Sequence, residues 1–251
     1  MLILQKDPKS VASEAFRTLR TNIQYSSFDE KIRTILITSS GPGEGKSTTS
    51  CNLALTTAET GKKVLIIDCD LRKPTIHKKF NMSNELGISN YLLGEITFEE
   101  AAKQYSENLY VLTCGTIPPN PSEMLSSNKL KEFLNEAKEK FDVVIIDSPP
   151  VLAVTDAQIL STLVQGVLLV VASNRTEKDM CVRAKELLMK VNAKILGVVL
   201  TRMSMKKGKG YGYGYYYYYE SDENGEKTKK KKIKKEGVHS TNDRYSLSHS
   251  S

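Results

Sequence analysis

Short apolar runs alternate with amphipathic stretches between residues 33 and 203. Six runs are expected to form strands: Thr34–Thr38, Val64–Ile67, Leu109–Leu112, Val143–Ile146, Val167–Val171 and Ile195–Leu200. Helical patterns are expected between them, near residues 46–60, 122–140, 156–164 and 176–190. Uninterrupted apolar runs are typical of strands that are buried on both faces. The alternation predicts an α/β fold with a doubly wound, mostly parallel sheet, which binds ligands at the carboxyl ends of its strands.

The pattern changes at both ends of this region. Residues 10–28 predict a separate helix that begins after Ser10 as its cap. An apolar stripe at four-residue spacing follows this helix: Ala15, Leu19 and Ile23. After Met203 too few aliphatic residues remain to build a core, and we expect a disordered tail. The expected organisation is an N-terminal helical segment (1–32), a central domain (33–203) and the tail (204–251).

Composition and charge narrow the class of protein. Of the 251 residues, 39% are hydrophobic and 26% are charged, as in soluble proteins, and no apolar run approaches the ~18 residues of a membrane span. The N-terminus lacks a signal-peptide pattern, so we expect an intracellular chain. The tail holds 11 Lys and Arg against 6 Asp and Glu, so it carries +5 of the net charge of +7. The body is nearly neutral, and its charge gives no reason to expect nucleic-acid binding.

Cysteine and histidine offer no separate chemistry. Four cysteines are scattered without a CxxC pair, and we expect reduced core thiols: Cys51, Cys69, Cys114 and Cys181. The three histidines show no metal-ligand spacing, which argues against a zinc site.

A glycine-rich loop, SGPGEGKST, follows the first predicted strand and precedes a predicted helix. Its glycines let backbone N–H groups approach phosphates, and the helix N-terminus adds its positive end. Lys46 is expected to contact the β- and γ-phosphates, and the Ser47 hydroxyl to ligate Mg²⁺. The residues expected to bind the nucleotide are Gly41, Gly43, Glu44, Gly45, Lys46, Ser47 and Thr48. One departure is that Ser40 stands where the strict pattern has glycine.

Two further predicted strands end in carboxylates. Asp68 and Asp70 follow one strand, two residues apart, and would share one side of an extended chain; Asp147 ends another strand. Aspartate is common at strand ends, but three such residues beside a phosphate loop favour a Mg²⁺ site. A basic cluster follows Asp70, and the sequence leaves open whether it is solvated or attracts phosphate or an acidic segment: Arg72, Lys73, Lys78 and Lys79.

These motifs resemble a known family. The segments GPGEGKST, LIIDCDLRKP and VVIIDSPP resemble bacterial tyrosine kinases, in particular the CpsD/CapB type of Gram-positive polysaccharide operons. The resemblance implies a P-loop NTPase fold like that of partition ATPases, although the extra loop lysine of those ATPases is absent. It implies ATP and Mg²⁺ as cofactors, with Mg²⁺ held by Ser47, Asp70 and Asp147. Asp68 is the first choice for the group that deprotonates tyrosine, but Asp68 and Asp70 remain alternatives.

The resemblance also assigns residues outside the phosphate loop. Arg202, which follows the last predicted strand, is expected to lie near adenine. Glu14, Arg17 and Arg20 form an ExxRxxR motif, which in the resembled family joins subunits into a ring that is often an octamer. The alternative for this motif is an exposed helix with a local ion pair.

The tail contains a tyrosine cluster. The resemblance implies autophosphorylation by a neighbouring subunit at seven residues: Tyr211, Tyr213, Tyr215, Tyr216, Tyr217, Tyr218 and Tyr219. There are two alternatives for this cluster: a low-complexity segment that associates non-specifically, and a segment that stacks on single-stranded nucleic acid. We expect no nucleic-acid partner, because the nearly neutral body offers no basic groove.

The expected function is an ATP-dependent protein-tyrosine kinase that regulates capsular or exopolysaccharide synthesis. Expected partners are further copies of the chain, the cytoplasmic tail of a transmembrane co-polymerase-like activator, and a tyrosine phosphatase. These partners imply a peripheral position at the inner face of the membrane. The alternatives are a partition-type ATPase switch without kinase activity and a scaffold whose tail recruits partners.

Overall fold

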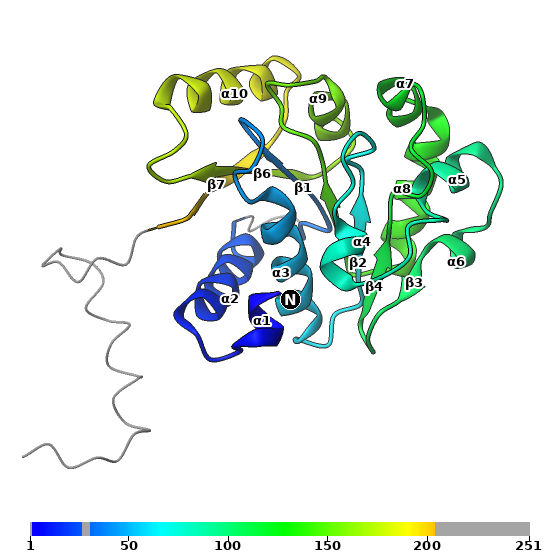
Figure 1. Ribbon diagram of the computed structural model, residues 1–251, viewed down its shortest axis with the longest axis horizontal. Helices are drawn as coiled ribbons and strands as arrows, with labels where there is room; N and C mark the ends of the chain where they lie inside the picture. Colours follow the sequence, from blue (N-terminus) through cyan, green and yellow to red (C-terminus); the bar gives the residue numbers. More distant parts are fainter. Residues whose placement is uncertain (1, 27–30, 204–251) are drawn as a thin grey trace, which may run out of the picture. The chain divides into compact units, whose positions relative to one another are not determined.

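A seven-stranded sheet runs through the part of the chain that the computed structural model describes, residues 2–26 and 31–203 (Figure 1). The strands are β1 (Thr34–Ser39), β2 (Val64–Asp68), β3 (Lys103–Gln104), β4 (Leu109–Leu112), β5 (Val143–Asp147), β6 (Gly166–Ala172) and β7 (Ile195–Thr201). Their order across the sheet is β3-β4-β2-β5-β1-β6-β7, and every pair except β3 with β4 is parallel. The prediction of a doubly wound, mostly parallel sheet is confirmed.

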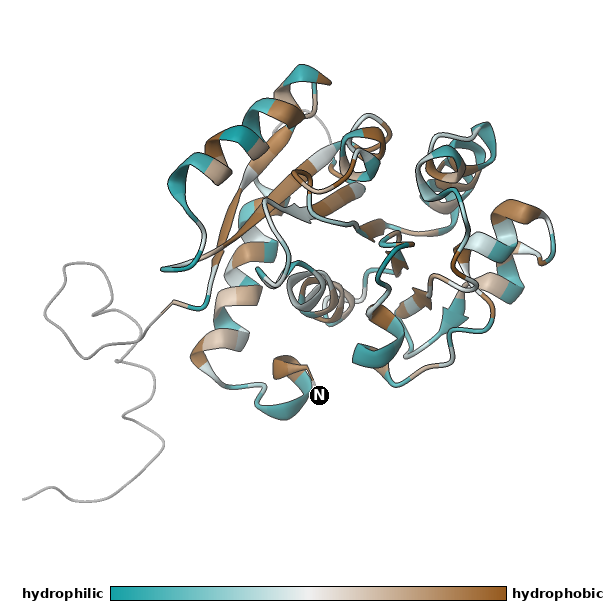
Figure 2. Cartoon of the chain, turned by 45° about the horizontal axis from the view of Figure 1, so that its top comes forward, coloured by the Kyte–Doolittle hydropathy of each residue, from teal (hydrophilic) through white to brown (hydrophobic). Residues whose placement is uncertain are grey.

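Helices cover both faces of this sheet. They are α1 (Ile3–Lys6), α2 (Val11–Gln24), α3 (Lys46–Ala58), α4 (Ile76–Phe80), α5 (Ile88–Leu93), α6 (Phe98–Ala101), α7 (Pro121–Leu125), α8 (Asn128–Lys140), α9 (Asp156–Ser161) and α10 (Lys178–Lys190). One core lies between the sheet and α2, α3 and α4; the other lies between the sheet and α5 to α10. Figure 2 shows apolar residues along the strands and on parts of each helix. Every strand except the exposed β3 contributes to both cores, because successive side chains point to opposite faces of the sheet.

The N-terminal helix begins as expected but buries a different side. Ser10 caps α2 by accepting a hydrogen bond from the Ser13 backbone N–H. Ile23 is buried and Leu19 is half-buried, whereas Ala15 is exposed, so the expected stripe is wrong at its first position. Ser13 is buried in its place, because its hydroxyl donates to the Asp7 carbonyl in the turn before the helix. Residues 2–26 and 31–203 belong to one compact unit, within which α2 packs on α3.

Some local expectations were also wrong. β7 is not buried on both faces, since Val198 and Leu200 are 57% and 56% exposed at the edge of the sheet. The helix expected over 122–140 breaks at Ser126, and Ser127 caps the second piece, α8. The four cysteines form no disulfide, but Cys181 is only half-buried. The predicted disorder of residues 204–251 lies outside the described residues.

The region between β2 and β4 contains short helices that the periodicity did not predict. Here Gly87 passes directly against the backbone after β4, where Ile88 N–H donates to the Thr113 carbonyl. A Cβ atom on Gly87 would lie 2.2 Å from the Thr113 oxygen and 2.3 Å from the Gly115 nitrogen. Backbone atoms on both sides leave this site no flexible neighbour that can move.

We expect Gly87→Ala to lower the free energy of unfolding by about 3 kcal/mol, because the added methyl group forces two backbone segments apart. Gly197→Ala is the matched control: no atom lies within 4 Å of its added Cβ. Urea denaturation of both variants measures the difference, and equal stabilities would contradict the close packing at Gly87.

Candidate active site

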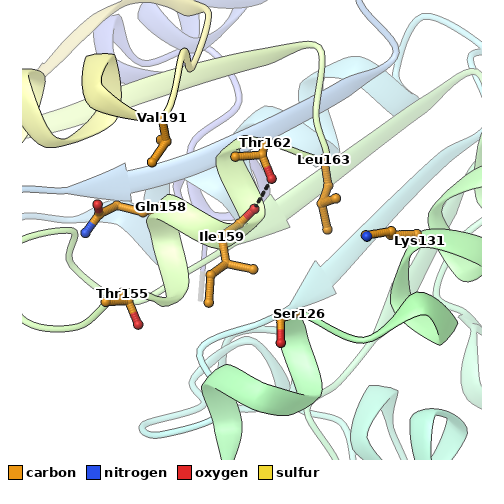
Figure 3. Close-up of a pocket in the computed structure, with 8 residues that line it drawn as sticks. All are labelled: Ser126, Lys131, Thr155, Gln158, Ile159, Thr162, Leu163 and Val191. Carbon is orange, nitrogen blue, oxygen red and sulfur yellow. Dashed lines mark hydrogen bonds between the residues drawn. The ribbon is translucent and has the colours of Figure 1, made fainter.

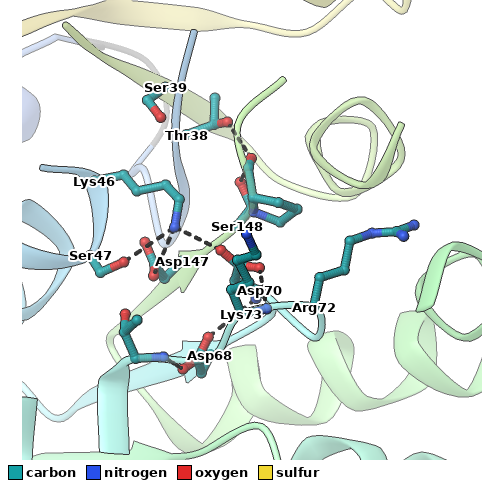
Figure 4. A network of polar contacts seen from close by, with 12 residues as sticks. Thr38, Ser39, Lys46, Ser47, Asp68, Asp70, Arg72, Lys73, Asp147 and Ser148 are labelled. Atoms are coloured by element: carbon teal, nitrogen blue, oxygen red, sulfur yellow. Dashed lines mark hydrogen bonds and ion pairs between the residues drawn. The ribbon is translucent and has the colours of Figure 1, made fainter. Parts of the chain in front are cut away.

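Predicted site residues that end β2 and β5, or that follow β1 and β2, lie close together at the carboxyl ends of these strands (Figure 4). β1 leads into the loop of residues 40–45, and α3 begins at Lys46. Gly43 and Gly45 have φ angles of +73° and +102°, which residues with side chains rarely adopt. With these two backbone conformations the loop turns from the end of β1 into the first turn of α3, which lies beside the ends of the strands. That geometry suits the binding of phosphates by backbone N–H groups.

Lys46 lies at the centre of the carboxylates. Its Nζ is 2.8 Å from Asp70 Oδ2, 3.3 Å from Ser47 Oγ and 3.9 Å from Asp147 Oδ2. Burial lowers the pKa of Lys46, but Asp147 and Asp70 outweigh burial and hold this pKa above its ordinary value. The lysine is therefore a permanent cation facing two aspartates, in a position to bind an anionic ligand.

Asp147 offers an oxygen that fits a cation. Its Oδ1 accepts a hydrogen bond from Ser50 Oγ at 2.9 Å, whereas its Oδ2 is buried without a hydrogen-bond partner. Burial, opposed by Lys46, raises the pKa of Asp147. A buried carboxylate oxygen without a hydrogen bond is costly, and with only the Lys46 ammonium at 3.9 Å this oxygen could also ligate a metal ion.

The surrounding groups suit Mg²⁺ rather than a metal held by protein ligands alone. Within the described residues, no group of three or more His, Cys, Asp or Glu is arranged to hold a metal ion. Mg²⁺ is usually held by one or two carboxylates together with water and substrate phosphates. Ser47, Asp70 and Asp147 fit that pattern beside a phosphate-binding loop.

Asp68 and Asp70 have different surroundings and do not share one side of a strand, because β2 ends at Asp68. Asp68 Oδ2 accepts from the backbone N–H groups of Thr75 and Ile76, both at 2.9 Å, and Oδ1 accepts from the Asp70 N–H. Burial, together with Asp147, raises the pKa of Asp68 to about 7. That pKa suits a general base. The three backbone donors also show that Asp68 shapes the loop from β2 to α4.

Thr201 ends β7, and it lies with Arg202 beside the phosphate loop. Thr201 Oγ1 donates to the Glu44 carbonyl at 2.6 Å, and Arg202 Nη2 donates to the Gly43 carbonyl at 2.8 Å. Arg202 adopts a φ angle of +56°, which is uncommon for a residue with a side chain. Its contact with adenine stays a prediction.

The ExxRxxR motif makes contacts within the chain. Arg17 forms an ion pair with Glu14 and lies 3.5 Å from Glu59, and Arg20 donates to the Thr56 carbonyl at 2.8 Å. The local ion pair expected from the spacing is therefore present, and the two arginines connect α2 with α3. Glu14 is half exposed on its side chain. The role of the motif between subunits stays a prediction.

Two contacts around the site escaped the sequence reasoning, because Ser50 and Asp156 were not singled out. Ser50, which binds Asp147, lies one turn after Lys46 on α3, and this i,i+4 spacing was the available signal. Arg72, from the basic cluster, binds Asp156 at the start of α9 through Nε and Nη2 at 2.9 and 3.1 Å. The two residues are 84 positions apart, so no local pattern indicates their contact.

A hollow of about 380 Å³ lies elsewhere, between α9 and the start of α8 (Figure 3). Its lining residues are Ser126, Lys131, Thr155, Gln158, Ile159, Thr162, Leu163 and Val191. This lining contains no carboxylate and no residue of the phosphate loop. The groups that can carry out phosphoryl transfer are thus at the strand ends, not in this hollow.

Comparison with known proteins identifies the family. A family model described as an AAA domain matches residues 32–195. The chain is 47% identical over 207 residues to the tyrosine-protein kinase YwqD of Bacillus subtilis, covering 82% of this chain and 87% of the relative. It is 42% identical to the putative tyrosine-protein kinase CapB of Staphylococcus aureus, covering 82% of this chain and 91% of CapB. The chain belongs to the bacterial tyrosine kinases.

Solved structures support the same family. The chimerical protein CapA2B2 superposes with a TM-score of 0.78 at 45% identity, covering 80% of this chain and 89% of that one. The kinase domain of Escherichia coli tyrosine kinase ETK gives a TM-score of 0.76 at 33% identity, with coverages of 83% and 84%. The septum site-determining protein MinD from Pyrococcus horikoshii, complexed with Mg-ADP, gives a TM-score of 0.60 at 26% identity, covering 70% and 72%. The expected resemblance to partition-type ATPases in fold is thereby confirmed.

This bacterial tyrosine kinase thus has the P-loop NTPase fold, which implies nucleotide binding. As a kinase it transfers a phosphoryl group to tyrosine. The carboxyl ends of its central strands bring together the lysine and the carboxylates that this reaction needs. Among the described residues, no helix has both the length and the apolar character required to cross a membrane.

Proposed function

We propose that this kinase uses ATP and Mg²⁺ to phosphorylate the tyrosine cluster in the tail of a neighbouring copy, and thereby regulates capsular or exopolysaccharide synthesis. The observation that carries the proposal is the buried Lys46, which lies between Asp70 and Asp147 and directly follows the glycine-rich loop. The tail supplies seven tyrosines within Tyr211–Tyr219, which are acceptors of the class that this family modifies.

Each residue of the site has a role in this proposal. Lys46 and the loop N–H groups bind the β- and γ-phosphates and stabilise the charge that develops during transfer. Ser47, Asp70 and Asp147 hold Mg²⁺, which when bound neutralises charge on the phosphate oxygens. Asp68, whose pKa is raised to about 7, is the first candidate to accept the tyrosine proton, with Asp70 as the alternative.

The same proposal includes partners. The exposed carboxylate of Glu14 and the α2 surface around Arg17 and Arg20 would join copies into a ring, in which the tail of one copy reaches the site of the next. The cytoplasmic tail of a transmembrane co-polymerase-like protein would activate the kinase at the inner face of the membrane. A tyrosine phosphatase would reverse the modification.

The experiment starts from purified, dephosphorylated chain incubated with ATP and Mg²⁺, alone and with an activator-tail peptide. We expect mass spectrometry to find several phosphates per chain on Tyr211–Tyr219. A variant with all seven tyrosines replaced by phenylalanine should carry none there. Mixing this variant with an excess of tail-intact chain whose site is inactive separates transfer between copies from transfer within one copy.

A partition-type ATPase switch is the second candidate, favoured by the structural similarity to MinD. It predicts ATP hydrolysis with unmodified tyrosines in every arm of the experiment. That result would overturn the proposed tail phosphorylation.

A further inference from the structure

Glu44 places a buried carboxylate inside the loop that is expected to bind phosphates. The residue is 4% exposed. Its carboxylate accepts hydrogen bonds from Ser40 Oγ at 2.8 Å, Gly41 N–H at 3.0 Å, Ser40 N–H at 3.2 Å and Thr176 Oγ1 at 2.9 Å. Three of these contacts come from the loop itself. The loop motif predicts that Glu44 binds the nucleotide, whereas the Glu44 side chain accepts its hydrogen bonds from protein donors.

These contacts connect the phosphate loop with a second loop. Thr176 lies between β6 and α10, and its hydroxyl accepts the Ala172 N–H at 3.2 Å while donating to Glu44. The Glu44 carboxylate thus connects the carboxyl end of β6, through Thr176, with the first residues of the phosphate loop. A Cβ on Gly41 would lie 3.3 Å from Glu44 Oε1, so the small residue at position 41 leaves room for the carboxylate.

The charge of Glu44 has the wrong sign for direct phosphate binding. A carboxylate near a polyphosphate repels it, and burial strengthens the repulsion by reducing solvent screening. We therefore look for the benefit of a carboxylate at this position in the conformation of the loop rather than in contact with phosphate. Buried backbone N–H groups need acceptors, and one ionised carboxylate can serve several donors at once.

We propose that Glu44 is a positioning residue, which holds the phosphate loop in its binding conformation and couples that loop to Thr176. The inference rests on the proposed function only in taking this loop as the nucleotide site. Nucleotide binding then depends on a hydrogen-bond network that joins residues of the loop to Thr176. Because the network already holds the loop in its binding conformation, nucleotide binding does not have to supply the free energy of ordering it. The affinity for nucleotide is therefore higher than it would be for a loop without these hydrogen bonds.

The sign of one affinity change tests this role. Glu44→Gln removes a negative charge, so charge repulsion alone predicts tighter binding of Mg-ADP. The positioning role predicts binding about tenfold weaker, because one end of the glutamine amide is a donor and would face the N–H and hydroxyl donors. Titration calorimetry with Mg-ADP gives the dissociation constant. Unchanged or tighter binding would overturn the proposal.

Two further sets of variants complete the test. Glu177→Gln removes the same charge from the exposed neighbour of Thr176 and should leave the affinity for Mg-ADP unchanged. Thr176→Val should weaken Mg-ADP binding about threefold, and Thr176→Ser should restore it. Wild-type affinity in Thr176→Val would overturn the coupling even if Glu44→Gln fails to fold. Because Mg-ADP binding requires no phosphoryl transfer, these results are independent of whether the tail is phosphorylated.

Discussion

Replacing Lys46 with methionine is expected to lower the rate of tail phosphorylation by about 10³-fold. Loss of a single charge-stabilising donor at a transferring centre has effects of this order. In this chain the loss has a second component. Lys46 is the cation that faces the Asp70 and Asp147 carboxylates at 2.8 and 3.9 Å, and without it their charges would oppose the arriving phosphates. The initial rate of tail phosphorylation, followed by intact mass, measures the effect.

The matched control is Lys185→Met, which removes an equal charge from an exposed position on α10. It should retain the wild-type rate. Thermal unfolding of both variants shows whether Lys46→Met still folds. If it does, its loss of phosphorylation is a loss of chemistry, and its binding of Mg-ADP can be measured as well. A Lys46→Met protein that keeps more than about a tenth of the wild-type rate would contradict the role of this lysine.

The second large effect is expected in stability. Arg72→Met should lower the free energy of unfolding by about 2 to 3 kcal/mol, because it leaves the Asp156 carboxylate buried with the Ser122 hydroxyl as a side-chain donor but without a cation beside it. Asp156 is 0% exposed, whereas the Arg72 side chain is 37% exposed. Water can therefore replace part of the lost guanidinium, which places the effect below the 3–5 kcal/mol of a fully buried pair.

Urea denaturation of Arg72→Met, Asp156→Asn and the double variant would isolate the interaction. The double variant should be more stable than the sum of the single effects predicts, since it leaves no unpaired buried charge. Lys73→Met, at the exposed position next to Arg72, is the control and should change stability by less than about 0.5 kcal/mol. Additive single effects would show that the Arg72–Asp156 contact does not stabilise the fold.

Local patterns were sufficient for much of the fold. All six predicted strands are present, because each run is only four to six residues long and consists mostly of β-branched, aliphatic or aromatic residues, which favours a buried strand over a helix. The helices α4, α5 and α6 were missed for the opposite reason. They contain four to six residues each, and a helix of one or two turns is too short to show a 3.6-residue period.

Local motifs specify which chemistry the chain can perform: the glycine-rich loop, Lys46 and the strand-ending aspartates are visible in the sequence, and the topology of a parallel sheet brings the strand ends together. How these groups are used depends on contacts between distant segments of the packed chain. The register of β2 and β5 sets Asp68 directly beside Asp147, which helps to raise the pKa of Asp68. The Glu44 carboxylate turns into its own loop toward Thr176, 132 residues later. Such contacts depend on which distant donors the packed chain leaves within hydrogen-bond distance, and no local period or motif records that.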